Sequence, residues 1–144
     1  MSKKREIFDA VKTQLTEQLA WAKVVDWEKI RIMSSDFGDH EIPCVQFYPL
    51  PTEYKPQQGR NQATMVLQVE VVLKSSVEGV VDQRDLFDRM DAVCLAFGTR
   101  PNLGVPGVIH VRLVKDFTDP HTIQPHFIGI LTFEVVYMTT YTGC

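Results

Sequence analysis

Apolar and polar positions alternate over one long stretch of the chain, residues 62–74. Every second position from Ala63 to Leu73 is apolar, whereas the positions between them are mixed. A period of two is typical of a β-strand that has one face on a core. The sequence therefore predicts a strand of roughly 40 Å, at about 3.3 Å per residue, around which the other elements are arranged.

Two other stretches repeat apolar residues every three or four positions, which predicts amphipathic helices. The first covers residues 3–19 with Ser2 as its N-cap, and the second covers residues 82–97 with Asp82 as its cap and Gly98 as its stop. Leu95 lies on the charged, outward side of the second helix. The predicted core-facing residues are Ile7, Phe8, Val11, Leu15 and Leu19 in the first helix, and Leu86, Phe87, Met90, Val93, Cys94 and Phe97 in the second.

Four further segments have the composition of strands, namely residues 27–32, 42–48, 108–115 and 127–141. Residues 49–61 contain three prolines and one glycine, which predicts a long polar loop. The resulting order is α-β-β-β-α-β-β. We expect one α+β domain over residues 1–144, with a mainly antiparallel sheet of about five strands and two helices packed on one face.

Two helices cover only one face of such a sheet, yet many residues on the opposite face are also apolar. Each of these side chains gains about 1.5–3 kcal/mol when it is fully buried, so we expect something to cover them. One alternative is internal: the sheet curls strongly, or the proline-rich loop folds over it. The other is a second subunit, which predicts an oligomer interface at Val66, Val72, Leu95, Val136 and Met138.

Composition and charge narrow the classes of function only slightly. The 144 residues are 44% hydrophobic and carry a net charge of −3, which does not indicate a general nucleic-acid binder. Lys3, Lys4 and Arg5 form either a solvated helix start or a contact for an acidic surface or nucleic acid. The three cysteines, Cys44, Cys94 and Cys144, are too far apart to predict a disulfide framework or a zinc site, and suit a reducing cytosol. The N-terminus lacks the apolar run of a signal peptide, and no apolar run is long enough to cross a bilayer.

Several clusters of reactive side chains have simpler interpretations than catalysis. Residues 36–41 could hold a metal ion, but Asp and Gly are also what a hairpin turn requires. Prolines beside His121 and His126 exclude a helix that would align the two rings. The chain has no nucleophile elbow and no phosphate-binding loop, so we expect no enzyme, metal or cofactor. The other candidates also have structural interpretations. His110 is interpreted as a strand histidine with a hydrogen-bond partner, and Cys94 as a buried thiol. A solvated helix face accounts for Asp82, Asp85, Asp88 and Asp91.

In its length and in this order of elements, the whole chain resembles the tail terminator family of long-tailed phages, the relatives of the lambda tail terminator, and the neighbouring tail-completion proteins. The features that match are the two helices, the long strand and the two closing strands. The resemblance implies a structural virion protein without catalytic residues, which forms a homo-oligomeric, hexameric ring. Such a ring caps the tail tube, stops its growth and offers a docking face to the head.

The resemblance also implies partners and a location. The partners are other copies of the chain, the tail tube protein and the head–tail connector protein, with DNA only in transit through the ring and no membrane. The location is the neck end of the virion tail after assembly in the host cytoplasm. Tyr54, Lys55 and Arg60 lie on the predicted loop, which looks like one that reaches a neighbour or the tube. The alternative is a small α+β ligand-binding domain or an enzyme with an unmarked pocket, involving His110 or residues 36–41.

Overall fold

The computed structural model describes residues 2–25, 43–57, 60–74, 83–118 and 126–139. Over these residues the chain has an α+β fold with the element order α1-β1-β2-β3-α2-β4-β5, which confirms the predicted fold class and order. The bounds are α1 Lys3–Gln18, β1 Lys23–Val25, β2 Cys44–Gln57, β3 Arg60–Lys74, α2 Gln83–Gly98, β4 Val108–Thr118 and β5 His126–Thr139.

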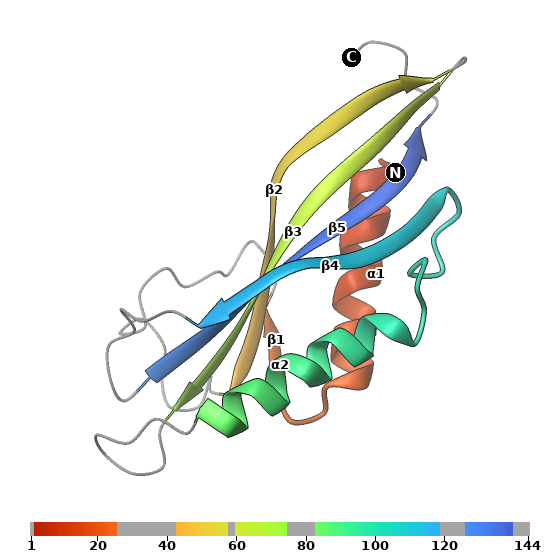
Figure 1. Ribbon diagram of the computed structural model, residues 1–144. Helices are drawn as coiled ribbons and strands as arrows, with labels where there is room; N and C mark the ends of the chain where they lie inside the picture. The colour runs from red at the N-terminus through yellow and green to blue at the C-terminus, as the bar shows by residue number, and fades with distance from the viewer. Residues whose placement is uncertain (1, 26–42, 58–59, 75–82, 119–125, 140–144) are drawn as a thin grey trace.

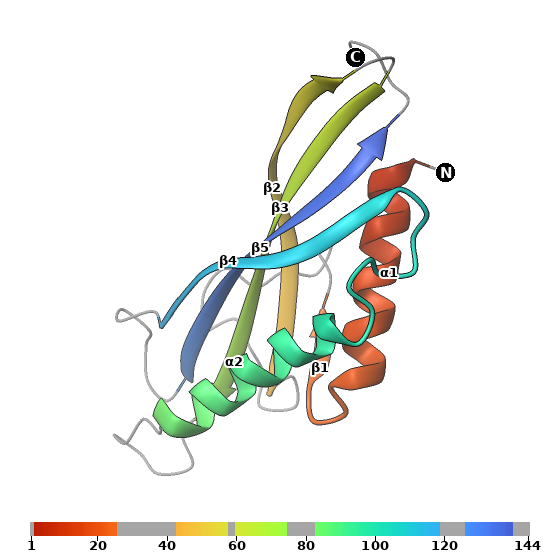
Figure 2. The same cartoon turned by 45° about the vertical axis from the view of Figure 1, so that its right-hand side comes forward.

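The strands form one sheet in the order β1-β2-β3-β5-β4 (Figure 1). The short strand β1 runs parallel to β2, and every other neighbouring pair is antiparallel. The long strand β3 is central, as predicted, because β2 pairs with it on one side and β5 on the other. Figures 1 and 2 show both helices on the same side of the sheet.

The core lies between the helices and the alternating apolar face of β3. Ala63, Met65, Leu67, Val69, Val71 and Leu73 are all buried there, as their period of two predicted. From the helices, the buried residues include Ile7, Val11 and Leu15 in α1 and Leu86, Met90, Val93 and Phe97 in α2. Two ring pairs join the layers, Phe8 with Phe47 at 5.3 Å and Phe97 with Phe133 at 4.5 Å between ring centroids.

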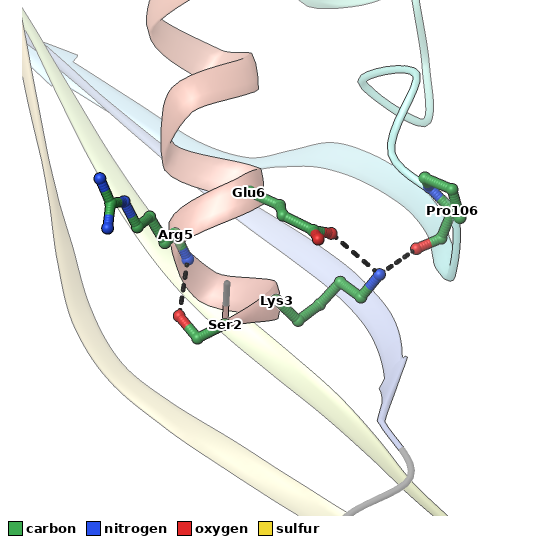
Figure 3. A network of polar contacts seen from close by, with 5 residues as sticks. All are labelled: Ser2, Lys3, Arg5, Glu6 and Pro106. Carbon is green, nitrogen blue, oxygen red and sulfur yellow. Dashed lines mark hydrogen bonds and ion pairs between the residues drawn. The ribbon is translucent and has the colours of Figure 1, made fainter.

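The N-terminus of α1 is fixed by its own polar residues (Figure 3). The Ser2 hydroxyl accepts a hydrogen bond from the Arg5 backbone N–H at 3.2 Å, which confirms the predicted cap. Lys3 Nζ donates to the Pro106 carbonyl at 2.7 Å and pairs with Glu6 at 3.1 Å. The basic start is therefore not simply a frayed, solvated end, because Lys3 links the helix to the loop before β4.

Two strand predictions are corrected by the structure. Residues 49–61 do not form a long loop: β2 continues to Gln57, β3 begins at Arg60, and Lys55 pairs with Gln62. The long strand β3 supplies a backbone partner that local composition does not reveal. Residues 23–25 form β1, where no strand was predicted, and the predicted strand over residues 27–32 lies outside the described residues.

Candidate interaction surface

The strand β4 forms one edge of the sheet and is poorly covered. Among the described strands it pairs with β5 alone, so much of its other side is open to a further strand, although the Val111 backbone N–H donates to the Pro101 carbonyl at 3.1 Å. Four of its apolar side chains are between 41% and 50% exposed, although β-branched and aromatic residues of this kind are usually buried. We call these four the β4 edge patch: Ile109, Leu113, Val114 and Phe117.

Two irregularities in the pairing of β4 with β5 explain why the patch is exposed in several directions. The register shifts between Val108 and His110, and again between Leu113 and Lys115, so Ile109 and Val114 lack a direct partner on β5. Leu113 stands opposite Phe133 on the helix-covered face, whereas Phe117 stands opposite Ile130 on the opposite face. The patch therefore lies along the edge itself rather than on one face of the sheet.

Helix α2 adds exposed apolar surface beside this edge. Phe87 was predicted to face the core but is 54% exposed, because Leu86 and Met90 already fill the space against the sheet. The half-buried Cys94 lies on the same side of the helix as Phe87. Burial raises the pKa of the Cys94 thiol, and the carboxylates of Asp91 and Asp116 raise this pKa further. Because Asp116 belongs to β4, this part of α2 lies near β4.

The opposite face of the sheet carries a connected polar cluster on β2 and β3. Glu70 accepts hydrogen bonds from Gln46 Nε2 at 2.5 Å and from the Tyr48 hydroxyl at 3.0 Å, and Gln68 donates to the Tyr48 hydroxyl. Burial and the neighbouring Glu70 carboxylate raise the pKa of Tyr48 well above its usual range. The polar side chains of this cluster bond to one another, so the cluster accounts for their burial without a ligand.

The five predicted interface residues fall into three groups. Leu95 is 68% exposed on the outer side of α2, as expected. Val66 and Met138 are half-buried. Val72 and Val136 were placed at an interface because their apolar side chains were expected to be uncovered. Both are buried within the single chain, so this reason does not apply to them. Val72 packs with Cys44 and Ile128 in a small cluster on the opposite face of the sheet.

The predicted contact loop is instead a hairpin arm, which we define as residues 50–57 of β2 with residues 60–65 of β3. Figures 1 and 2 show that the arm extends past the N-terminus of α1. Tyr54 and Lys55 are exposed on β2, and Arg60 is the first residue of β3. The Lys4 ammonium lies 5.7 Å from the centre of the Tyr54 ring, which places the basic start of α1 beside the arm.

The remaining candidates for chemistry do not come together. Residues 36–41, His121 and Asp82 lie outside the described residues. His110 is exposed on β4, and Asp85 pairs with Arg89 at 3.5 Å along α2. Within the described part of the chain, no three His, Cys, Asp or Glu side chains are grouped as metal ligands would be. No described helix is long and apolar enough to cross a membrane.

Sequence reasoning missed Phe117, one of the four residues of the β4 edge patch. The predicted strand ended at residue 115, but β4 continues to Thr118. The alternating pattern around Lys115 and Phe117 was only a weak signal that the strand continues. The residues on either side of Phe117, Asp116 and Thr118, are also common in turns. The search against known protein families finds no match for this chain, and the search of characterised proteins finds no relative.

Proposed function

We propose that the protein is a structural subunit that assembles with copies of itself into a ring, and that this ring is the tail terminator or a neighbouring completion ring of a phage tail. The observation that carries the proposal is the β4 edge patch, because a stable soluble monomer rarely leaves several large apolar side chains exposed along an uncovered edge strand. The element order, which is the one on which the resemblance rests, supports the narrower assignment.

The function follows from symmetry. A helical tube grows by adding like subunits, so its end is a repeated template. A ring of matching symmetry binds that end once, presents a different surface above, and so stops growth. Each subunit needs two complementary sides for its neighbours, one surface for the tube protein and one for the head–tail connector. This function needs no catalytic group, metal or cofactor. The hairpin arm, which carries Tyr54 and Lys55, is the segment that we assign to the tube or neighbour contact.

The test is native mass spectrometry on the purified chain over a range of concentrations, alone and with preformed tail tubes. We expect a closed oligomer, with six copies as the leading stoichiometry, either in solution or on the tube end. Tubes capped in this way should stop growing when more tube protein is added. A chain that stays monomeric at every concentration and ignores tubes would rule out the proposal. In that case a self-contained binding domain becomes the better interpretation.

A further inference from the structure

We propose that copies of the chain join head to tail through their sheet edges, with β4 of one copy pairing with the hairpin arm of the next. The occupant of the β4 edge is therefore the β2 side of the arm in a second copy. The contact would extend the sheet across the subunit boundary. This inference relies on the proposed function only where it says that the linked subunits close into a ring. The edge-to-edge contact itself is independent of any phage tail.

The first support is strand direction. The four long strands alternate in direction across the sheet, in the order β2, β3, β5, β4. When a second copy is placed beside the first by a simple rotation, its β2 therefore meets β4 in antiparallel orientation. Antiparallel pairing is the more stable ladder, so the repeat requires no reversal of the subunit. A head-to-tail contact of this kind generates a ring when the rotation closes.

The second support is that β2 also has an uncovered side. The strand β1 pairs with Cys44–Gln46 only, and the rest of β2 pairs with β3 alone among the described strands. Leu50 and Tyr54 are exposed apolar side chains on this part of β2. They match the β4 edge patch in chemistry, so that a junction would remove apolar surface of both copies from water.

The third support concerns which edges can pair with each other. The arm contains Pro51 and Pro56, and Pro49 stands just before it. Proline has no backbone N–H, so two arms would face each other with too few donors. The strand β4 contains no proline, so no residue on its open side lacks a backbone N–H, although the Val111 N–H already donates to the Pro101 carbonyl at 3.1 Å. The difference favours a contact between unlike edges over a contact between two arms.

The test uses one variant that blocks each edge. Val114→Asp places a charge in the β4 edge patch, and Leu50→Asp places one on the arm. Both side chains are exposed, so each variant should fold, which circular dichroism and urea unfolding would verify. We expect each variant alone to associate at least about tenfold more weakly than the wild type in sedimentation velocity. Leu95→Asp tests the interface that the sequence predicted on the outer side of α2, where Leu95 is exposed, and under the edge contact it should assemble like the wild type.

Mixing the two variants separates the possible geometries. Val114→Asp keeps an intact arm and Leu50→Asp keeps an intact β4, so an equimolar mixture should form a one-to-one dimer that neither variant forms alone. Contact between two β4 edges would instead let Leu50→Asp dimerise alone, and this would overturn the inference. Wild-type-like assembly of both variants, loss of assembly in Leu95→Asp, or a wild type that is always monomeric in solution would also overturn it. Open chains of subunits that ignore tail tubes would support the edge contact while refuting the proposed terminator function.

Discussion

At the scale of single residues, the side-chain amide of Gln14 connects the two helices. The residue is buried in α1, and its Nε2 donates to the carbonyl of Ala96 at 2.7 Å, with longer contacts to Phe97 and Arg100 at 3.3 and 3.4 Å. These carbonyls lie at the C-terminus of α2, where the last turn lacks partners within the helix. Gln14 thus caps α2 from another element, a role that no local sequence pattern predicts.

We expect Gln14→Met to lower the free energy of unfolding by about 1–3 kcal/mol, because the helix carbonyls lose a buried donor. Gln14→Glu should cost more, since a buried carboxylate would face carbonyl oxygens. Urea unfolding measures both changes. Thr13→Ala, at the exposed neighbouring position, is the control and should change stability by less than about 0.7 kcal/mol. Equal stabilities for Gln14→Glu and the wild type would refute the capping role.

Tyr48 is a second residue whose surroundings can be tested, through the pKa of its hydroxyl. Burial, and then the Glu70 carboxylate, raise the pKa of its hydroxyl in the folded state above the value of about 10 in an unfolded chain. The neutral hydroxyl therefore contributes stability that is fully present below about pH 10 and is lost as the pH rises toward the folded-state pKa. We expect stability to fall above about pH 10, and to fall less steeply in Tyr48→Phe.

The part played by Glu70 can be measured separately. Glu70→Gln removes the negative charge but keeps a hydrogen-bond acceptor, so it should lower the pKa of Tyr48. The difference in tyrosinate absorbance between chains with and without Tyr48→Phe isolates this residue from the other tyrosines. An unchanged Tyr48 titration in Glu70→Gln would mean that burial alone sets the pKa.

At the scale of elements, the contact of α2 with β5 depends on the absence of a side chain at Gly129. A Cβ atom there would lie 2.5 Å from Met90 Sδ and 3.1 Å from Leu86 Cδ1. We expect Gly129→Ala to destabilise the fold by about 1–3 kcal/mol through overpacking. The double variant Gly129→Ala with Met90→Ala should lose less unfolding free energy than the two single variants lose in total, because the smaller side chain makes room for the new methyl group.

Gly98 provides the matched control for this contact. It ends α2, and a Cβ atom there would meet nothing within 4 Å. Gly98→Ala should therefore be neutral or stabilise by up to about 1 kcal/mol, since it reduces the conformational entropy of the unfolded chain. Thermal unfolding distinguishes the two substitutions by the sign of the shift. Strictly additive costs for Gly129→Ala and Met90→Ala would show that the helix moves as a whole instead.

Elements were predictable wherever a local pattern decides them. Apolar residues at every second position predicted which face of β3 is buried. Apolar residues at every third or fourth position predicted the helix faces that pack on it. The arm was not predictable from composition, because its proline content argues for a loop and only pairing with β3 makes it a strand. Phe87 illustrates the same limit on a helix, since the width of the buried arc depends on how closely α2 approaches the sheet.

At the scale of the whole molecule, strand order decides which apolar residues remain at the surface. The chain makes β4 before β5, yet β5 inserts between β3 and β4, so the earlier strand becomes the edge. Sequence reasoning recognised a surplus of apolar side chains but assigned it mainly to the face opposite the helices. There, Val72 and Val136 are already buried, and the larger exposed surface belongs to β4 and α2. The candidate interaction surface could therefore be located only once the strand order was known.

Strand order also predicts the pattern of amide hydrogen exchange. The strands β3 and β5 are paired on both sides, so their amides should exchange slowest in the dilute protein, while the outward amides of β4, apart from that of Val111, exchange fast. Raising the protein concentration should slow exchange in two segments together, β4 and residues 50–57 of β2, and leave the exposed face of α2 unchanged. In Val114→Asp the concentration dependence should disappear from both segments, because each junction pairs β4 of one copy with residues 50–57 of the next. Slowing confined to β4 would indicate contact between two β4 edges, and slowing in α2 would place the subunit contact on the helix layer.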